Sequence, residues 1–142
     1  MRLSLLSLAV LAVPYAAAQS AAPPSDIDQI EAVIGLYFEG HATGVGNHFE
    51  RAFHPDAQMY SAGDDGLRQT ALRTWWEGPD GQPANDEADR HRRIVSVDVS
   101  GSVATAKLEL DYPGALIYDY MVLVKTDGRW QIVTKAFSVA TR

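Results

Sequence analysis

The last third of the chain alternates between apolar segments and dipeptides that favour tight turns, and this pattern restricts the fold more than any other feature. The turn dipeptides are Ser100-Gly101, Pro113-Gly114 and Asp127-Gly128, of which Asp-Gly is the strongest hairpin signal. They separate four predicted strands: Arg93 to Val99, Val103 to Tyr112, Leu116 to Thr126 and Trp130 to Val139. Strands joined by turns this short pair with their sequence neighbours, so the pattern predicts an antiparallel meander.

The first half of the chain has helical spacing instead. Ser25 can cap a helix whose first turn carries Asp26 and Asp28, both favourable at the positive end of the helix dipole. The segment 40–46, which begins and ends with glycine, ends this helix. Apolar residues recur along it at intervals of three and four: Ile27, Ile30, Val33, Ile34, Tyr37 and Phe38.

Two shorter helices are expected before the meander. Asn47 is predicted to cap the second, with Phe49 and Phe53 pointing inward and Pro55 ending it. The third is predicted to start at Thr70 and to continue through Leu72, Trp75 and Trp76 until Gly78-Pro79. A short strand (Ala57 to Ser61) and a turn (Gly63 to Gly66) lie between them, and a polar loop follows (Asp80 to Asp89). Helices followed by a meander predict an α+β domain with three N-terminal helices on one face of the sheet.

The N-terminus has the layout of a secretory signal peptide. Arg2 supplies a positive charge, residues 3–13 form an apolar run, and Ala16-Ala17-Ala18 offers small residues for cleavage before Gln19. The run is too short to span a bilayer as an ordinary helix, so the mature chain is expected to have no membrane span. The alternative is a buried N-terminal helix. We therefore expect a signal peptide at residues 1–18, a linker at 19–25 and one domain at 26–140, exported to the periplasm or the extracellular space.

Composition excludes several classes of function. The 142-residue chain has 18 acidic and 12 basic residues and no cysteine, so disulfides and thiolate metal sites are excluded. The basic cluster Arg90-His91-Arg92-Arg93 is short, and nucleic-acid binding needs a longer basic stripe, so no nucleic-acid partner is expected. No pair of the four histidines has the spacing of a helical or strand metal motif, so no metal site is predicted. No cofactor is predicted either.

The segment Leu116 to Thr126 is apolar on both faces. Tyr118 and Tyr120 share one face with Val122 and Val124, whereas Met121 and Leu123 lie on the other. A strand of this kind is covered on both sides. The helices cover one face of the sheet, and a second subunit packed sheet to sheet can cover the other. A homodimer through the sheet is therefore expected.

The order of these elements resembles the NTF2-like (SnoaL-like) cone fold, closing with Lys125-Thr-Asp-Gly-Arg-Trp-Gln-Ile-Val133. The segments Tyr37-Phe-Glu-Gly-His41, Phe53-His-Pro-Asp-Ala57, Asp111-Tyr-Pro113 and Asp119-Tyr120 are similar to the group called putative lumazine-binding proteins. The resemblance covers roughly residues 26–137. It implies a pocket between a curved sheet and the helices. It leaves the activity open, because the superfamily includes ketosteroid isomerases, polyketide cyclases, dehydratases, epoxide hydrolases and non-enzymatic binding domains.

Asp119 and Lys135 are the most informative polar pair, because each interrupts an apolar strand and a buried charge needs a partner. A two-residue loop at Asp127-Gly128 would pair Lys125 with Trp130, place Asp119 opposite Ala136 and put Lys135 on the other face. A three-residue loop with a glycine bulge would set Asp119 directly across from Lys135. In that register the pair is either a buried acid that the lysine tunes and that can move a proton on a ligand, or a salt bridge that fixes the register. The pair would lie in the pocket or in the dimer interface.

His41 lies one helical turn beyond Tyr37, where a neutral imidazole can act as a general base or contact a ligand, or can simply end the helix. The positions of His48, His54 and His91 favour structural roles, although His91 can also line the open end of the cone. Aromatic side chains suit the walls of a pocket but also suit a core. Asp119 and His41 are the candidate catalytic residues. The candidate ligand-binding residues are Tyr37, His41, Tyr60, Trp75, His91, Tyr118, Asp119 and Lys135.

Three functions therefore fit the sequence. The first is an exported domain that binds a small aromatic or hydrophobic molecule without covalent chemistry. The second is a cofactor-independent isomerase, dehydratase or lyase that uses a carboxylate or histidine in the pocket as a general base. The third is a protein-interaction or dimerisation module that uses the face of the sheet.

Overall fold

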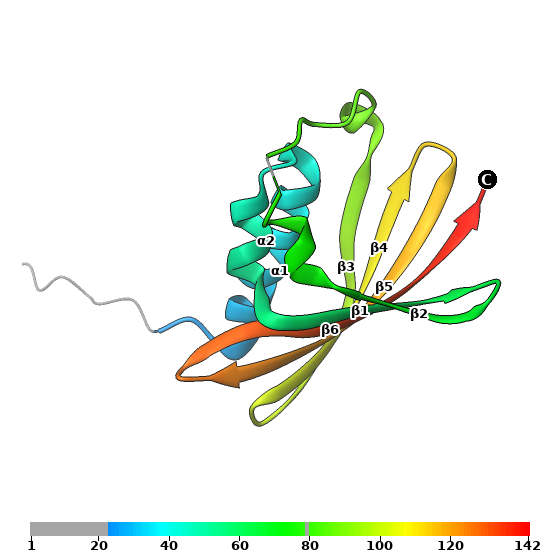
Figure 1. Ribbon diagram of the computed structural model, residues 1–142. Helices are drawn as coiled ribbons and strands as arrows, with labels where there is room; N and C mark the ends of the chain where they lie inside the picture. The colour runs from blue at the N-terminus through cyan, green and yellow to red at the C-terminus, as the bar shows by residue number, and fades with distance from the viewer. Residues whose placement is uncertain (1–22, 79) are drawn as a thin grey trace, which may run out of the picture.

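The computed structural model describes residues 23–78 and 80–142 (Figure 1). As the sequence predicts, its helices precede a run of antiparallel strands. The predicted signal peptide at 1–18 lies outside the described residues. In the described part of the chain, no helix is long and apolar enough to cross a membrane. The elements are α1 (Asp26–Thr43), α2 (Gly46–Ala52), β1 (Phe53–Gly63), β2 (Gly66–Ala71), the 3₁₀ helices η1 (Leu72–Trp75) and η2 (Glu87–Asp89), β3 (His91–Ser100), β4 (Val103–Tyr112), β5 (Ala115–Thr126) and β6 (Arg129–Thr141).

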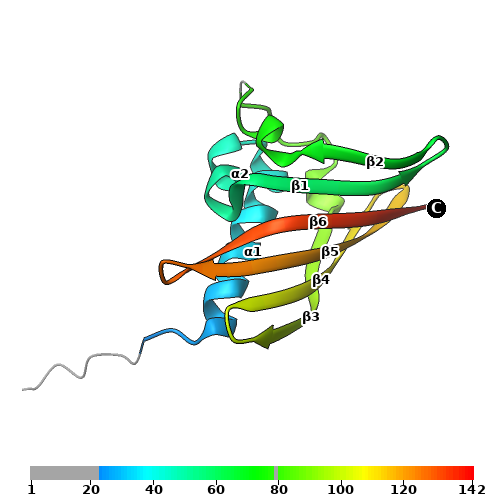
Figure 2. The same cartoon turned by 60° about the horizontal axis from the view of Figure 1, so that its bottom comes forward.

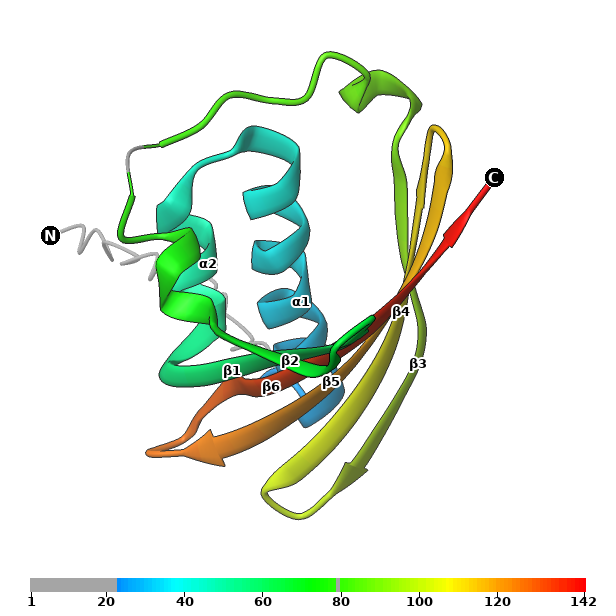
Figure 3. The same ribbon diagram turned by 45° about the vertical axis from the view of Figure 1, so that its right-hand side comes forward.

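The strands form a six-stranded sheet in the order β2-β1-β6-β5-β4-β3, seen side by side in Figure 2. Strands β3 to β6 pair antiparallel with their sequence neighbours, which confirms the predicted meander. Strand β1 pairs antiparallel with β2 but parallel with β6. Figure 3 shows that the sheet curves around α1, which lies in its concave face.

Helix α1 begins where the sequence predicts. The Ser25 hydroxyl accepts a hydrogen bond from the Asp28 N–H (3.2 Å), and the Asp28 carboxylate accepts one from the Ser25 N–H (2.9 Å), which completes a capping box. The helix ends at Gly44, whose φ of 73° is left-handed. Its buried face consists of Ile30, Ile34, Tyr37 and Gly40.

The predicted bounds of the second helix are wrong. Helix α2 begins at Gly46 after Val45, which offers no side-chain cap, so Asn47 does not cap it. The Gly46 N–H instead donates to Asp80 Oδ1 (2.8 Å), a carboxylate 34 residues away in sequence. The helix ends at Ala52, and Pro55 lies within β1, where a residue without an N–H is tolerated more readily than inside a helix.

The predicted third helix is also wrong, so the described residues hold two α-helices and not three. Thr70 belongs to β2, where it pairs with Met59 across the β1–β2 hairpin. Only Leu72–Trp75 is helical, as one 3₁₀ turn. Strand β2 is almost entirely exposed and therefore lacks the apolar alternation by which a strand is recognised in a sequence.

The core lies between α1 and the concave face of the sheet. Strand β4 places Ala104, Ala106, Leu108 and Leu110 in this core, alternating with Thr105, Lys107 and Glu109 as predicted. Trp130, Ile132, Met121 and Leu123 complete its centre. Because α1 covers this face, any polar residue that β5 or β6 directs inward meets the helix.

Candidate functional site

One polar cluster interrupts this apolar interior, and it joins α1 to β5 and β6. The Tyr37 hydroxyl donates to Asp119 Oδ2 (2.5 Å) and accepts a hydrogen bond from Lys135 Nζ (2.8 Å). Lys135 Nζ also lies 3.2 Å from Asp119 Oδ1 as an ion pair. The exposed fractions of Tyr37, Asp119 and Lys135 are 0%, 0% and 4%. We call these three residues the buried triad.

Neither of the two registers considered from the sequence describes the β5–β6 ladder. The Asp127-Gly128 loop has two residues, with φ of 52° and 75°, and pairs Lys125 with Trp130. An irregularity beyond Leu123 then shifts the register, so that Asp119 lies opposite Phe137 and Lys135 lies opposite Met121. Asp119 and Lys135 are therefore diagonal neighbours on one face, which is close enough for a long side chain to bridge.

Burial sets the protonation of the triad. Desolvation raises the pKa of Tyr37 well above its ordinary value, and the Asp119 carboxylate raises it further. Burial lowers the pKa of Lys135, and the Asp119 charge opposes that change. Tyr37 is therefore a neutral hydroxyl at physiological pH, and its proton is directed at Asp119.

Aromatic rings surround the Lys135 ammonium. Nζ lies 4.9 Å from the ring centroid of Trp75, 5.1 Å from that of Tyr37 and 5.2 Å from that of Phe137. Contacts of this length between a cation and a ring are attractive, and more so where water is excluded. The rings and the Asp119 carboxylate together offset the cost of burying the ammonium.

His41 lies beside the triad, one helical turn beyond Tyr37. Its ring meets Tyr37, Phe49 and Trp75 edge to face, with centroids 4.6, 5.4 and 5.5 Å away. Its Nε2 atom is buried and has no hydrogen-bond partner in the described part of the chain. Burial, helped by the positive charges of Lys135, Arg92 and Arg90, lowers the pKa of His41 to about 3, so the imidazole is neutral at pH 7.

A second polar cluster attaches the loop that contains η2 to the meander. The Arg92 guanidinium donates to both carboxylate oxygens of Glu87 (2.6 and 2.9 Å) and to the Tyr112 hydroxyl (2.7 Å). The guanidinium carbons of Arg90 and Arg92 lie 4.4 and 4.9 Å from the Tyr112 ring centroid. These contacts hold η2 at the end of the sheet next to the C-terminal end of α1 (Figure 3).

The profile of one family, described as Putative lumazine-binding, matches residues 25–138. The chain belongs to this family. Among similar solved structures is an NTF2-like protein of unknown function from Shewanella baltica OS155, with a TM-score of 0.71 and 20% identity, covering 84% of this chain and 100% of that one. Another is an NTF2-like protein of unknown function from Methylobacillus flagellatus KT, with a TM-score of 0.68 and 29% identity, covering 82% and 93%. The predicted NTF2-like fold is thus confirmed.

One named relative carries an activity in its name. A protein from Cladobotryum sp, called Aldolase FrzH, is 25% identical over 113 residues, which is 80% of this chain and 90% of that protein.

In this family member, five of the eight sequence-predicted ligand-binding residues come together: Tyr37, His41, Trp75, Asp119 and Lys135. The other three are on the convex face. Tyr118 flanks Asp119 on β5 and therefore points the opposite way, with Lys107 Nζ 4.9 Å from its ring. Tyr60 pairs with Ala136, and His91 is exposed at the start of β3 opposite Asp111.

Two contributions were missed from the sequence. Phe137 is absent from the candidate residues, although it lies two positions after Lys135 in the same strand and therefore shares its face as a wall of the same site. Arg92 was considered only as part of the basic cluster Arg90-His91-Arg92-Arg93, although its side chain is turned inward to Glu87 and Tyr112. Strand alternation from the exposed His91 is the signal that would have found it.

The buried triad is enclosed by side chains. Surface hollows of about 410 to 500 Å³ lie elsewhere on the described residues, and Tyr37, Asp119 and Lys135 line none of these. Across residues 23–78 and 80–142, no three His, Cys, Asp or Glu side chains group as metal ligands do. The chemistry that the triad and His41 offer is proton donation, proton acceptance and charge stabilisation.

Proposed function

We propose that this protein binds a small molecule beside the buried triad, under Trp75. The observation that carries the proposal is a buried polar atom beside the triad, His41 Nε2, that has no hydrogen-bond partner among the described residues. The great majority of buried polar side-chain atoms in proteins have a hydrogen-bond partner, and an exception at a candidate site is consistent with a role toward a bound molecule. His41 and Asp119 both contact Tyr37, so one ligand placed there can reach His41 Nε2 and the Asp119 carboxylate together.

Trp75 is the side chain that such a ligand would displace on its way to the triad. It stands on the single turn η1, is partly exposed, and packs on both His41 and Lys135. A single 3₁₀ turn has few hydrogen bonds to break, so displacing it costs less than displacing α1 or the sheet.

The description of the family suggests the class of ligand. Lumazine is a flat heteroaromatic ring with hydrogen-bond donors and acceptors along its edges. Tyr37, Asp119 and Lys135 supply complementary groups, and Trp75 and Phe137 supply aromatic surface. A pteridine-like molecule is therefore the first ligand to test.

The test is a fluorescence titration of lumazine into the purified protein. Saturable binding is expected for the native chain, with affinity about tenfold weaker or worse in Asp119→Asn, because a hydrogen bond to a charged group is lost. Tyr120→Phe removes a hydroxyl from the exposed convex face and is the matched control. Circular dichroism confirms that each variant folds. Equal affinity in Asp119→Asn and the native chain would contradict this site.

Catalysis is the second candidate, favoured by the 25% identity to Aldolase FrzH. The Asp119 carboxylate can accept a proton from a carbon next to a carbonyl group, and Tyr37 and Lys135 can stabilise the resulting enolate oxygen. Incorporation of deuterium next to the carbonyl of cyclohexanone, followed by NMR in D₂O, measures this step. Exchange that persists unchanged in Asp119→Asn would assign it to other groups.

We also propose a homodimer through the convex face. A hollow of about 420 Å³ lies there, with Tyr120 and Lys107 among its lining residues, and Tyr120 is 54% exposed. Tyr120→Glu is expected to yield monomers in analytical ultracentrifugation. Asp119 faces α1 on the opposite side and contributes nothing to this surface.

Export is proposed from the N-terminal pattern. Expression of the full chain in a bacterial host, followed by N-terminal sequencing of the periplasmic fraction, tests it. Cleavage before Gln19 is the expected result.

A further inference from the structure

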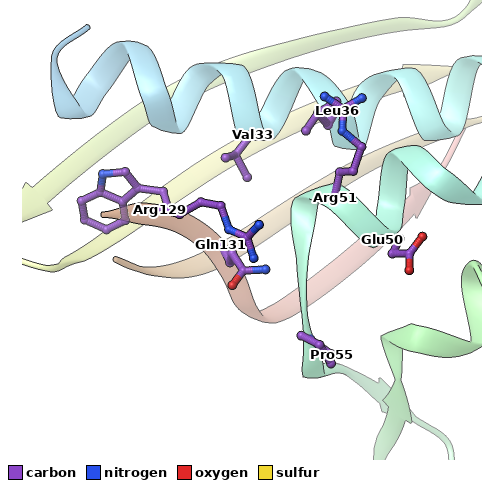
Figure 4. A pocket seen from close by; sticks show the side chains of 8 residues that line it. Val33, Leu36, Glu50, Arg51, Pro55, Arg129 and Gln131 are labelled. Carbon is purple, nitrogen blue, oxygen red and sulfur yellow. The ribbon is translucent and has the colours of Figure 1, made fainter. Parts of the chain in front are cut away.

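We infer that a second binding site, separate from the buried triad, lies between α1, α2 and the start of β6 and takes a small organic anion. A hollow of about 500 Å³ opens there, within the range of about 300 to 1,000 Å³ that small-molecule sites occupy (Figure 4). It is lined by Val33, Leu36, Glu50, Arg51, Pro55, Arg129, Trp130 and Gln131. We call it the outer hollow.

The outer hollow and the buried triad are lined by different residues of α1. Val33 and Leu36 are three residues apart and line the hollow, whereas Ile34 and Tyr37 are fully buried in the core. Val33 and Leu36 are only partly buried, so apolar surface is accessible at the floor. Gln131 adds a fixed polar group, because it is 8% exposed and its Nε2 donates to the Phe53 carbonyl (3.3 Å).

Two arginines give this apolar floor a positive rim. In Figure 4, the Arg51 side chain extends from α2 toward Leu36. The Arg129 side chain extends from β6 and lies beside Gln131. Both are exposed, and neither takes part in an ion pair with another described residue, although the chain carries a net charge of −6. The Glu50 carboxylate points away from both guanidinium groups in this view.

An adjoining hollow extends the site. It shares Pro55, Arg129 and Gln131 with the outer hollow and adds His54, Thr126 and Asp127. Asp127 adds a carboxylate to the lining of the adjoining hollow, which disfavours an anion there. The negative group of the ligand is therefore placed between Arg51 and Arg129, with its apolar part over Val33 and Leu36.

These features select the chemistry of the ligand. Guanidinium groups bind carboxylates and sulfonates through paired hydrogen bonds, whereas the apolar floor favours a hydrocarbon body. A carboxylate on a flat aromatic body meets both requirements, so 2-naphthoate is the probe. Because both arginines are exposed, binding is expected to weaken as salt concentration rises.

The experiment is a titration of 2-naphthoate into the ¹⁵N-labelled protein, followed by two-dimensional NMR. Saturable shifts are expected at the amides of Leu36, Arg51 and Gln131. Arg51→Gln and Arg129→Gln are each expected to weaken binding by roughly fivefold, the size of one exposed charge interaction. Both side chains are at the surface, so both variants are expected to fold.

Arg68→Gln is the matched control, because Arg68 is also exposed, also lacks an ion pair among the described residues and lines a different hollow. It is expected to bind 2-naphthoate as the native chain does. Equal weakening in Arg68→Gln would show general charge attraction and overturn the proposal. Two further arms use 2-naphthalenemethanol, which lacks the charge, and sodium sulfate, which lacks the apolar body.

Weaker binding in both arms supports an organic-anion site. The proposal is overturned by the same shifts with sulfate alone, by equal affinity for the neutral alcohol, or by shifts centred on Tyr37 and Asp119. The last outcome would place the ligand at the triad and leave the outer hollow without one.

Discussion

Lys135 Nζ lies 3.2 Å from Asp119 Oδ1 across two neighbouring strands, although neither residue is the other's direct partner in the ladder. The two side chains meet along the diagonal, and the Tyr37 hydroxyl from α1 closes the triangle. One helix and two strands are thus joined by charged and polar groups at a place where apolar packing would serve. This arrangement makes the triad sensitive to the loss of any one member.

Removal of one charge from the triad should be more damaging than removal of both. Lys135→Met leaves the Asp119 carboxylate buried without its cation, which is expected to lower the free energy of unfolding by about 3 to 5 kcal/mol. The double variant Asp119→Leu, Lys135→Met should regain most of that loss. Urea denaturation of the single and double variants measures both values. A double variant as unstable as Lys135→Met would show that the charges do not act as a pair.

His41 should make the protein less stable in mild acid. Its pKa of about 3 in the folded state is below the ordinary value of 6.5, so the unfolded chain binds a proton more readily. The contribution of neutral His41 is therefore fully present above pH 6.5 and is lost as the pH falls toward 3. Between pH 7 and pH 5, the native chain should lose about 2 kcal/mol of unfolding free energy relative to His41→Gln. Exposed His91→Gln is the control and should follow the native chain.

Gly44 should resist substitution for two separate reasons. Its φ of 73° is strained for residues with a side chain, and an added Cβ would lie 2.9 Å from the Gly81 carbonyl carbon. Gly44→Ala is expected to cost about 2 kcal/mol or more of unfolding free energy. Gly101 also has a left-handed φ, 59°, but an added Cβ would meet open space. Gly101→Ala should therefore lower the free energy of unfolding only by the backbone strain, about 1 kcal/mol. Thermal unfolding compares the two, and equal costs would rule out the contact with the loop.

Glu87 should control the loop that carries η2. Glu87→Gln removes the bidentate pair with Arg92, so the amides of residues 84–90 are expected to exchange hydrogen faster by mass spectrometry. Glu109→Gln is the matched control, because Glu109 forms the same kind of pair with Arg93 but joins two strands that are already hydrogen-bonded. Unchanged exchange at residues 84–90 in Glu87→Gln would show that other contacts hold the loop.

The ion pair between Asp119 and Lys135 shows how much of the candidate site the sequence can predict. Both residues interrupt apolar strands, and their charges predict that each needs a partner. Counting from Asp127-Gly128 nevertheless fails, because the irregularity between Val122 and Leu123 adds a residue to β6 after the turn has set the register. Such an irregularity depends on how β6 fits both β5 and the parallel strand β1, and no local pattern records that fit.

The faces of the aromatic residues illustrate the same limit. Alternation correctly separates Tyr118 and Tyr120 from Asp119 and Met121, but it does not tell which of the two faces α1 covers. Tyr60, Tyr118 and His91 fell on the convex face, whereas Phe137 and Arg92 fell on the concave one. The third predicted helix failed for a related reason, since Thr70 is held in β2 by its pairing with Met59.

The sequence by itself determined the capped first helix, the meander with its turns, and the α+β class, because helix caps, glycine turns and hydrophobic period are properties of neighbouring residues. Only the tertiary structure decided that β1 lies parallel to β6, that α1 packs on the face bearing Asp119, and that Tyr37 joins the ion pair. These outcomes depend on contacts between residues about 80 to 100 positions apart, which form only when the sheet has curved around the helix.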